Sequence, residues 1–362
     1  LGEDMDHKYL EMVKTLTIYD GDDIDKNATI VYTPLNGAGS VSVQRVLRER
    51  GFEGIHVVPE QEHPDPDFTT VGYPNPEDTK AFKYSEALGH KVGAELLLAT
   101  DPDSDRLAIE VLDKDGNYVA FNGNQTGAIL IKYIIEGLYN TGKLPKNPAI
   151  VKSIVTGDLG KVVGEKYGVT TYESLTGFKN ICGRIPELIE TGFNYIFGYE
   201  ESIGYTTGTF VRDKDAVSSA MLLCEAAAFY KKQGKTLLDI RAELFEEFGY
   251  YKEKQVALVL EGIEGQQRIA RMMESYRVDY VTDFDGTKLE EVIDYEQGYK
   301  DIPSSNVLKF MLADGSWYAL RPSGTEPKIK LYIYTKADSD DAALKNIETM
   351  ESLVLAKLDL IK

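Results

Sequence analysis

The sequence predicts an α/β protein with two mixed α/β domains followed by an α+β domain. Over most of the 362 residues, short β-branched runs alternate with stretches of helical spacing, a pattern typical of sheets covered by helices. The end of the chain has several short strands between two amphipathic stretches, which predicts an antiparallel sheet. The chain is too long for one ordinary core, so we expect domains over residues 1–121, 122–250 and 251–362.

The first domain is expected to begin with an acidic loop at 1–6, followed by a helical stretch at 9–18. Further helices are expected at 41–50 and at 77–92, where Pro76 stands at the helix entrance. This domain is expected to contain five strands, at 28–33, 56–59, 94–99, 106–112 and 118–121.

The second domain repeats this alternation of strands and helices, which suggests a related α/β unit, although no residue-level repeat proves it. Its strands are expected at 149–155, 169–173 and 195–197, and its helices at 125–139, 158–167, 180–190 and 216–232. The third domain is expected to have strands at 254–260, around 280, and at 307–312, 317–320 and 329–334, with helices at 264–276 and 339–360.

The composition favours a globular protein that does not act on nucleic acid. The net charge is -19 and the isoelectric point is about 4.7, whereas nucleic-acid binding calls for a basic surface. No apolar run approaches the ~20 residues that span a bilayer, so we expect no membrane partner. Cys182 and Cys224 are the only cysteines and lie in helical segments, which favours reduced thiols and a cytoplasmic location.

An acidic run at 101–106 follows a predicted buried strand. Ligands of open α/β sheets bind at the carboxyl ends of strands, and carboxylates at alternate positions suit one hard cation. An EF-hand loop would need Gly and Glu where Arg106 and Leu112 stand. We therefore expect Asp101, Asp103 and Asp105 to bind Mg²⁺, with Arg106 near a phosphate. A solvated acidic turn is the alternative.

A second polar loop, Glu200-Glu201-Ser202, also follows a predicted strand. A carboxylate accepts hydrogen bonds from two sugar hydroxyls at once, so this loop suits a polyol. It is not a serine-hydrolase nucleophile elbow, because Glu200 stands where the G-x-S-x-G motif needs Gly. An ordinary polar turn is the alternative.

A third loop, at 321–327, joins two predicted strands of the last domain. Arg321, the hydroxyls of Ser323 and Thr325, and the glycine-opened backbone at Gly324 are donors that suit a phosphate monoester. The loop lacks the spacing of a Walker phosphate loop. A tight hairpin with a surface arginine is the alternative.

Two shorter stretches supply further candidates. Residues 176–179 lead into a predicted helix, where backbone amides can meet an anion. Lys214 precedes the helix at 216–232 and has a side chain suited to proton transfer or phosphate contact. Taken alone, Lys179 and Lys214 are more often simple surface residues.

The three loops, in this order and one per predicted domain, resemble those of the α-D-phosphohexomutases, the phosphoglucomutase/phosphomannomutase family. Residues 101–106 match the family's D-x-D-x-D-R magnesium loop, 200–202 are similar to its sugar-binding loop, and 321–327 to its phosphate-binding loop. Residues 74–77 and 176–179 match other stretches typical of the family. The resemblance covers essentially the whole chain. It implies two phosphoglucomutase-type mixed α/β domains and a C-terminal domain similar to TATA-binding protein.

The resemblance implies a Mg²⁺-dependent intramolecular phosphotransferase. Family members move phosphate between the C1 and C6 hydroxyls of a hexose through a phosphoserine and a bisphosphate intermediate. That serine belongs to a first domain, in a loop similar to T-A-S-H-N-P, and no such stretch occurs in this sequence. Because the chain also starts at Leu1 rather than Met, we expect domains two to four of a longer polypeptide. Without its N-terminal domain, this fragment is expected to be inactive.

The resemblance also assigns roles to the candidate residues. The expected substrate-binding residues are Thr176, Gly177, Lys179, Glu200, Ser202, Arg321, Ser323, Gly324 and Thr325. Arg106 and Lys214 are expected to be catalytic, with Lys214 replacing a histidine that the sugar loop here lacks. The form of that loop is most similar to phosphoglucomutases, so we expect a glucose phosphate substrate. A phosphopentomutase-like specificity and a noncatalytic sugar-phosphate-binding protein are the alternatives.

Overall fold

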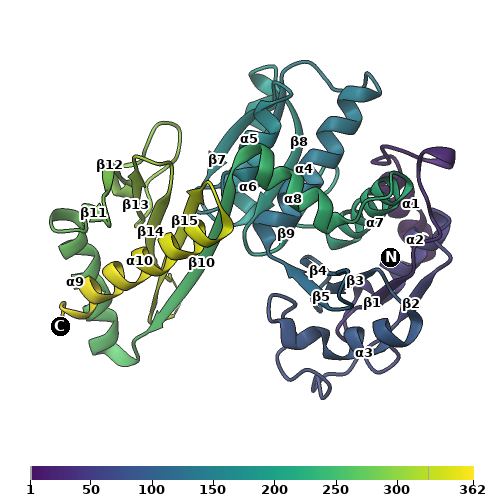
Figure 1. The fold of residues 1–362 in the computed structure, drawn as a ribbon, viewed down its shortest axis with the longest axis horizontal. Coiled ribbons are helices and arrows are strands. Elements are labelled where there is room, and N and C mark those ends of the chain that lie inside the picture. Colours follow the sequence, from purple (N-terminus) through teal and green to yellow (C-terminus); the bar gives the residue numbers. More distant parts are fainter. Residues whose placement is uncertain (1, 325) are drawn as a thin grey trace. The chain divides into compact units, whose positions relative to one another are not determined.

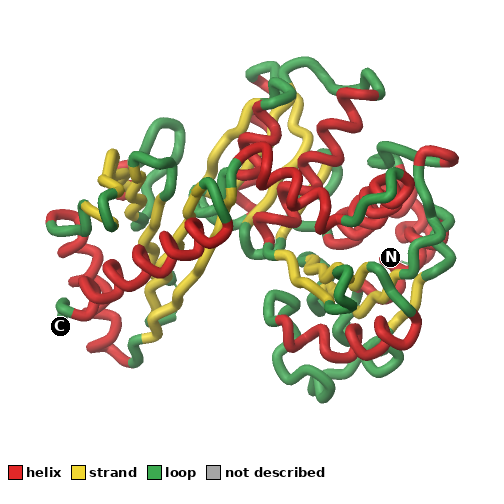
Figure 2. The backbone as a smooth tube through the Cα atoms, viewed as in Figure 1, coloured by secondary structure: helices red, strands yellow, loops and turns green. Residues whose placement is uncertain are grey.

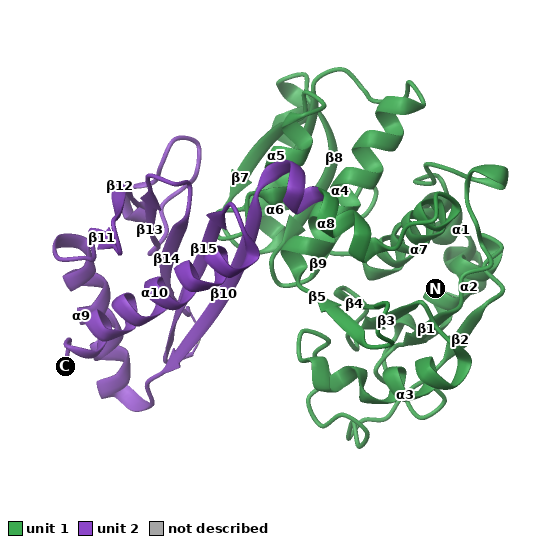
Figure 3. Cartoon of the chain, in the orientation of Figure 1, with its two compact units in different colours: residues 1–243 green, residues 244–362 purple. Residues whose placement is uncertain are grey.

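The computed structural model describes residues 2–324 and 326–362. The chain forms two compact units, residues 1–243 and 244–362 (Figure 3). In each unit, helices pack against β-sheets, as the ribbon and tube views show (Figures 1 and 2). No helix in these described ranges combines the length and the apolar character needed to cross a bilayer.

The first sheet of unit 1 has five strands: β1 (Ile30–Thr33), β2 (Ile55–Val57), β3 (Leu96–Thr100), β4 (Leu107–Leu112) and β5 (Tyr118–Phe121). The helices of this region are α1 (Glu3–Lys14), α2 (Gly39–Glu49) and α3 (Lys83–Val92), with 3₁₀ turns at Gly21–Asp23 and Thr79–Phe82. The strand order is β2-β1-β3-β4-β5. Strand β1 pairs in parallel with β2 and β3, and β4 and β5 continue the sheet antiparallel. All of β3 is buried, which explains its unbroken apolar run.

The second sheet of unit 1 has four strands: β6 (Pro148–Ser153), β7 (Thr170–Ser174), β8 (Asn194–Glu200) and β9 (Gly204–Thr207). Its helices are α4 (Gly123–Asn140), α5 (Leu159–Glu165), α6 (Phe178–Glu190) and α7 (Ala216–Lys232). The strand order is β7-β6-β8-β9, with β6 parallel to β7 and β8 and with β9 antiparallel to β8.

The two sheets of unit 1 share one topology. In each, the first strand lies between the second and third, and the fourth pairs antiparallel with the third. The acidic loop at 101–106 joins the third and fourth strands of the first sheet, and residues 201–203 join the third and fourth strands of the second. The relationship that the sequence alternation suggested is therefore present in the strand order, and the two polar loops occupy equivalent places.

A fully buried carboxylate, Glu225 on α7, connects both halves of unit 1. It accepts hydrogen bonds from the backbone N–H groups of Ile18 and Tyr19, at 2.6 and 3.0 Å. The Tyr133 hydroxyl of α4 donates at 2.7 Å, and the Arg50 guanidinium lies at 2.9 Å. The carboxylate is thus both paired and hydrogen-bonded, the condition under which a charge tolerates burial.

Unit 2 is built on a six-stranded antiparallel sheet in the order β10-β15-β14-β13-β12-β11. The strands are β10 (Tyr250–Val259), β11 (Asp283–Phe284), β12 (Thr287–Asp294), β13 (Leu308–Leu312), β14 (Trp317–Pro322) and β15 (Lys328–Ala337). The other elements are α9 (Gly262–Val278), α10 (Asp340–Asp359) and a 3₁₀ turn at Tyr295–Gln297. Helix α8 (Leu237–Phe248) contains the boundary between the units.

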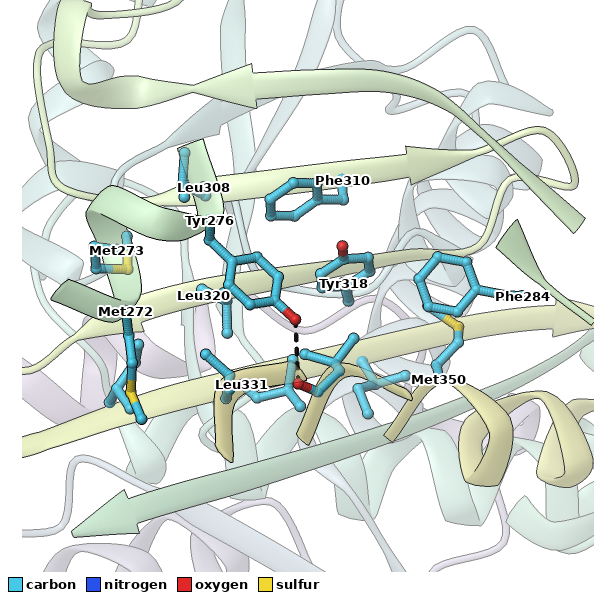
Figure 4. Close-up of a cluster of buried hydrophobic side chains, with 14 of the residues drawn as sticks. Met272, Met273, Tyr276, Phe284, Leu308, Phe310, Tyr318, Leu320, Leu331 and Met350 are labelled. Atoms are coloured by element: carbon cyan, nitrogen blue, oxygen red, sulfur yellow. Dashed lines mark hydrogen bonds between the residues drawn. The ribbon is translucent and has the colours of Figure 1, made fainter. Parts of the chain in front are cut away.

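The core of unit 2 lies between one face of this sheet and helices α9 and α10. Alternate residues of β13 and β14 belong to this core, and Lys309, Trp317 and Ala319 between them are buried as well. The rings of Phe310 and Tyr318 stack with centroids 4.4 Å apart. The buried Tyr276 hydroxyl donates to the carbonyl oxygen of Val354 at 3.1 Å, so its polar end is satisfied (Figure 4).

Several expected boundaries were wrong. Residues 3–6 belong to helix α1 rather than to a loop, because acidic residues in a first helical turn are favoured by the helix dipole. Helix α3 starts at Lys83 instead of residue 77, after a 3₁₀ turn. Helix α8 and strands β9 and β12 had no counterpart among the expected elements. Both cysteines lie in buried helical positions and are free, as expected.

We predict that Glu225→Gln lowers the free energy of unfolding of unit 1 by about 3–5 kcal/mol, because removing one buried partner leaves Arg50 poorly compensated. Urea denaturation followed by circular dichroism measures this change, while the fluorescence of Trp317 follows unit 2 separately. Glu243→Gln, in an exposed pair with Lys235, is the matched control and should cost about 1 kcal/mol or less. Equal effects of the two substitutions would contradict the role of Glu225.

A second prediction concerns Glu110 on β4, which is 2% exposed and has a carboxyl oxygen without a hydrogen-bond partner among the described residues. Burial, reinforced by Glu86, raises the pKa of Glu110 to about 8. The folded state therefore holds this proton more tightly than the unfolded state, and stability should fall as pH rises from about 4.5 through 8. Denaturation between pH 5 and 9 should show this slope, and Glu110→Gln should flatten it. The exposed Glu53→Gln control should retain it.

Candidate functional site

The acidic loop at 101–106 brings three carboxylates to one point at the end of β3. One oxygen each from Asp101, Asp103 and Asp105 lies within 4.8 Å of the others. Asp101 is buried and Asp103 is exposed, so the cluster opens to solvent on one side. Carboxylate oxygens at this spacing suit a hard divalent cation such as Mg²⁺.

Hydrogen bonds within the acidic loop fix its carboxylates. Asp101 Oδ1 accepts from the backbone N–H groups of Asp105 and Arg106, at 3.1 and 2.9 Å. Ser104 has a φ of 60°, the left-handed turn that lets the chain fold back on Asp101. The buried Oδ1 of Asp105 accepts no hydrogen bond from a described residue. A buried carboxylate oxygen that accepts no hydrogen bond from the described residues fits a cation ligand.

The electrostatics of the loop also fit a cation site. Burial raises the pKa of Asp101 to about 7; the backbone N–H of Arg106 opposes this rise, and the carboxylates of Asp105 and Asp103 add to it. Three crowded carboxylates repel one another. A bound cation would relieve this repulsion.

The turn before α2 packs against the backbone of the acidic loop. The backbone N–H of Ala38 donates to the Pro102 carbonyl at 2.8 Å. A Cβ at Gly37 would lie 2.4 Å from the Cα of Pro102, so only glycine permits this approach. Gly37 therefore lets the turn before α2 pack directly against the acidic loop.

Lys214 lies where three loops of unit 1 meet. Its ammonium is 2.7 Å from Asp105 and 3.2 Å from Asp213. It also lies 5.5 Å from the centre of the Phe178 ring, and a Cβ at Gly204 would meet its side chain at 2.5 Å. Lys214 thus joins the acidic loop to the 176–179 stretch and to the end of the Glu200 loop, which is defined here as residues 200–204.

Arg106 and the backbone beside it connect the acidic loop to the Glu200 loop directly. Arg106 forms an isolated antiparallel bridge with Gly204, and the N–H of Leu107 donates to the Ile203 carbonyl at 3.0 Å. The Arg106 guanidinium nitrogen is 3.7 Å from Asp101 and 3.8 Å from Asp105. The side chain remains 37% exposed, so it is accessible to an anion.

The Glu200 side chain is buried and organises the neighbouring loop. Its Oε1 accepts the Gly177 backbone N–H at 2.5 Å, just before helix α6. Gly177 has a φ of 101°, which favours glycine there. Lys179 is exposed and Ser202 is partly exposed. The structure therefore brings Glu200 and Gly177 together and leaves Ser202 and Lys179 accessible to a ligand.

The neighbouring Glu201 points instead into a polar cluster that sequence reasoning missed. Its Oε2 accepts from the Thr156 hydroxyl at 2.8 Å and from the Ser153 hydroxyl at 3.3 Å. Fully buried Lys152 donates to the Thr156 carbonyl and pairs with Asp158 at 2.9 Å. The available signals were Lys152 and Ser153, polar residues inside the apolar strand predicted at 149–155, and Thr156 directly after it.

The loop at 321–328 lies in unit 2 and is described there alone. The N–H of Ser323 donates to the Lys328 carbonyl at 2.8 Å, which closes the loop, and the Arg321 guanidinium donates to the Tyr332 hydroxyl at 3.4 Å. A cavity of about 520 Å³ is lined by Arg321, Pro322, Ser323, Gly324, Glu326, Pro327 and residues of α9 and 305–306. Thr325, another expected phosphate ligand, lies outside the described residues.

Comparisons with known proteins agree with this arrangement. The family profile described as phosphoglucomutase/phosphomannomutase, alpha/beta/alpha domain II, matches residues 7–116. The profile for alpha/beta/alpha domain III matches 122–248, and that for the C-terminal domain matches 266–353. The three profiles follow one another in the order expected from the loops.

The chain is also similar to individual members of that family. A phosphoglucomutase of Staphylococcus haemolyticus is 37% identical over 350 residues, covering 94% of this chain and 63% of that protein. The chain thus spans about three fifths of the length of the curated relatives that it matches.

Solved structures show the same fold. The open form of Paramecium parafusin, a phosphoglucomutase, matches with a TM-score of 0.69 at 16% identity, covering 98% of this chain and 62% of that one. N-acetylphosphoglucosamine mutase of Aspergillus fumigatus, solved with GlcNAc-6P and magnesium, matches with a TM-score of 0.56 at 11% identity, covering 98% and 65%. Three consecutive family domains and this degree of sequence similarity establish that the chain belongs to the phosphoglucomutase/phosphomannomutase family.

Proposed function

We propose that this chain is the part of a phosphoglucomutase that binds the metal, the sugar and the nonreacting phosphate. The whole enzyme would interconvert glucose 1-phosphate and glucose 6-phosphate. The observation that carries this proposal is the position of Lys214, in contact with Asp105 of the acidic loop and packed beside Gly204 and Phe178. A cation site and a sugar-binding loop that share one lysine suit phosphoryl transfer to a sugar hydroxyl.

In this proposal, Asp101, Asp103 and Asp105 hold Mg²⁺, which supplies positive charge to the transferring phosphoryl group. The A. fumigatus relative solved with magnesium supports this choice of metal. Arg106, held next to two of these carboxylates, contacts the same phosphoryl group. Lys214 holds the proton that is exchanged with the sugar hydroxyl.

The sugar and its second phosphate are assigned to the remaining candidates. Glu200 accepts hydrogen bonds from the sugar hydroxyls, and the Ser202 hydroxyl donates to them or accepts from them. Residues 176–179 lie beside these two residues, since the Gly177 N–H donates to Glu200. The loop with Arg321, Ser323, Gly324 and Thr325 holds the nonreacting phosphate, because its guanidinium, hydroxyls and turn amides match phosphate oxygens. Binding at that distant phosphate can also support the chemical step.

The reacting serine is proposed to come from another domain of the same polypeptide. The sequence has no T-A-S-H-N-P-like stretch, and an in-line nucleophile is required for phosphoryl transfer. In the complete enzyme, the phosphoserine would transfer its phosphoryl group to a free hydroxyl of the sugar phosphate, which leaves serine and a sugar bisphosphate. The bisphosphate would then reorient and return its other phosphoryl group to the serine. A cytoplasmic location remains an expectation of the sequence.

We predict that the purified 362-residue chain does not convert glucose 1-phosphate to glucose 6-phosphate in a dehydrogenase-coupled assay. A longer polypeptide with a serine-bearing domain restored should do so, and should prefer glucose 1-phosphate over ribose and mannose phosphates. Turnover by the isolated chain would overturn the assignment of the nucleophile. A restored polypeptide with no turnover would contradict the mutase proposal and favour a sugar-phosphate-binding protein.

Asp103→Asn should weaken Mg²⁺ binding to this chain by about tenfold or more, because the exposed carboxylate loses its charge while packing is unchanged. Isothermal titration with MgCl₂ measures the affinity, and circular dichroism checks that the fold is intact. Asp115→Asn, at the tip of the β4–β5 hairpin, removes an exposed carboxylate elsewhere and should leave Mg²⁺ affinity unchanged. Unchanged affinity in Asp103→Asn would exclude this metal site.

A further inference from the structure

The Glu200 loop contains two adjacent carboxylates that face different surroundings. Glu200 accepts the Gly177 N–H, at the entrance of α6. Glu201 turns toward the carboxyl end of β6, where Thr156 and Ser153 donate to one of its oxygens. The chemistry of the two residues is the same, so the difference comes from what each side chain contacts.

Thr156 holds this second carboxylate through several bonds. Its hydroxyl donates to Glu201 Oε2 at 2.8 Å and accepts the Glu201 backbone N–H at 3.3 Å. The Ser153 hydroxyl lies 2.8 Å from the Thr156 hydroxyl. Thr156 is 0% exposed, so water does not compete for these bonds.

The backbone of Thr156 is itself held in place by Lys152. The fully buried ammonium of Lys152 donates to the Thr156 carbonyl at 2.8 Å. The same ammonium pairs with Asp158 at 2.9 Å and with Glu173 at 3.0 Å. These bonds connect β6, the start of α5 and β7 to the Thr156 backbone. The Thr156 hydroxyl is therefore a donor in a fixed position, and such a donor can orient the loop that contains Glu201.

Helix α4 closes the other side of the same loop. A Cβ at Gly123 would lie 2.0 Å from the Glu201 carbonyl oxygen, so the first turn of α4 packs directly against the loop backbone. Glu201 is therefore held by hydrogen bonds through its side chain and by close packing at its backbone. Glu200 and Ser202, the two expected sugar ligands, lie immediately on either side of it in the chain.

We propose that Thr156 is a positioning residue for sugar-phosphate binding and that Glu201 is its anchor rather than a sugar ligand. The Thr156 hydroxyl fixes the Glu201 carboxylate, which sets the backbone of the loop and therefore the orientation of Glu200 and Ser202. The choice of a sugar phosphate as the ligand rests on the proposed function. The anchoring of the loop depends only on contacts within unit 1.

The test compares Thr156→Val, which removes the hydroxyl at nearly constant volume, with Thr156→Ser, which keeps it. Hydrogen–deuterium exchange of the full chain should show faster exchange in residues 199–205 for Thr156→Val and wild-type exchange for Thr156→Ser. Thr171→Val on β7 is the matched control, because its buried hydroxyl has no hydrogen-bond partner among the described residues. Unchanged exchange in Thr156→Val would overturn the proposal.

The same variants are then titrated with glucose 1-phosphate and, separately, with MgCl₂. Thr156→Val should weaken glucose 1-phosphate binding by about tenfold, the size of one hydrogen bond to a charged group, with Mg²⁺ affinity unchanged and with recovery in Thr156→Ser. If the wild-type chain binds no glucose 1-phosphate, the proposed function fails, whereas the exchange measurement still decides whether Thr156 anchors the loop. Equal sugar-phosphate affinity in wild type and Thr156→Val would also overturn the positioning role.

Discussion

The site in unit 1 depends on a buried carboxylate far along helix α7. Glu225 is 0% exposed and receives bonds from the segment after α1, from Arg50 at the end of α2 and from Tyr133 of α4. Four segments therefore have to converge on one charge, because an unpaired buried carboxylate would be strongly unfavourable. This constraint sets the position of α7 relative to both sheets.

The first turn of α7 contacts the acidic loop, so the position that Glu225 gives to the helix also affects that loop. Asp215 caps the helix by accepting the N–H groups of Val217 and Ser218. The N–H of Ala216 donates to the Ser104 carbonyl at 3.2 Å, and Lys214, one residue before the cap, reaches Asp105. Glu225 thus fixes the middle of helix α7, and the acidic loop and Lys214 lie at the N-terminal end of that helix. The bridge between Arg106 and Gly204 and the hydrogen bond from Leu107 to Ile203 hold the Glu200 loop beside them.

Sequence reasoning located the polar loops because each is a local run of side chains with a definite chemistry. Asp101, Asp103 and Asp105 do converge, and Lys214 does lie beside them. The sequence could not separate Glu200 from Glu201, because their different contacts come from Gly177 and Thr156, which are distant in sequence. The buried Lys152 was missed because its ion pairs, to Asp158 just before α5 and to Glu173 on β7, exist only once the strands and the helix are packed together.

The fold was predictable wherever a segment had one clear periodicity. The buried run of β3 and the alternation of Leu308, Phe310 and Leu312 along β13 are such cases. Helix α1 was misplaced because acidic residues at 3–6 appear loop-like, although they stabilise a helix start. Strand β9 was missed because Gly204–Thr207 is short and obtains its pairing only from β8.

We infer that the acidic loop and the Glu200 loop form one site for a metal and a sugar phosphate. A titration with Mn²⁺ in place of Mg²⁺ tests this inference, because the unpaired electrons of Mn²⁺ accelerate nuclear relaxation of molecules bound nearby. With the 362-residue chain and Mn²⁺, the phosphorus and ring protons of glucose 1-phosphate should relax faster than in the Asp103→Asn variant. If both ligands bind but the relaxation of the sugar phosphate does not change, the two loops do not form a common site.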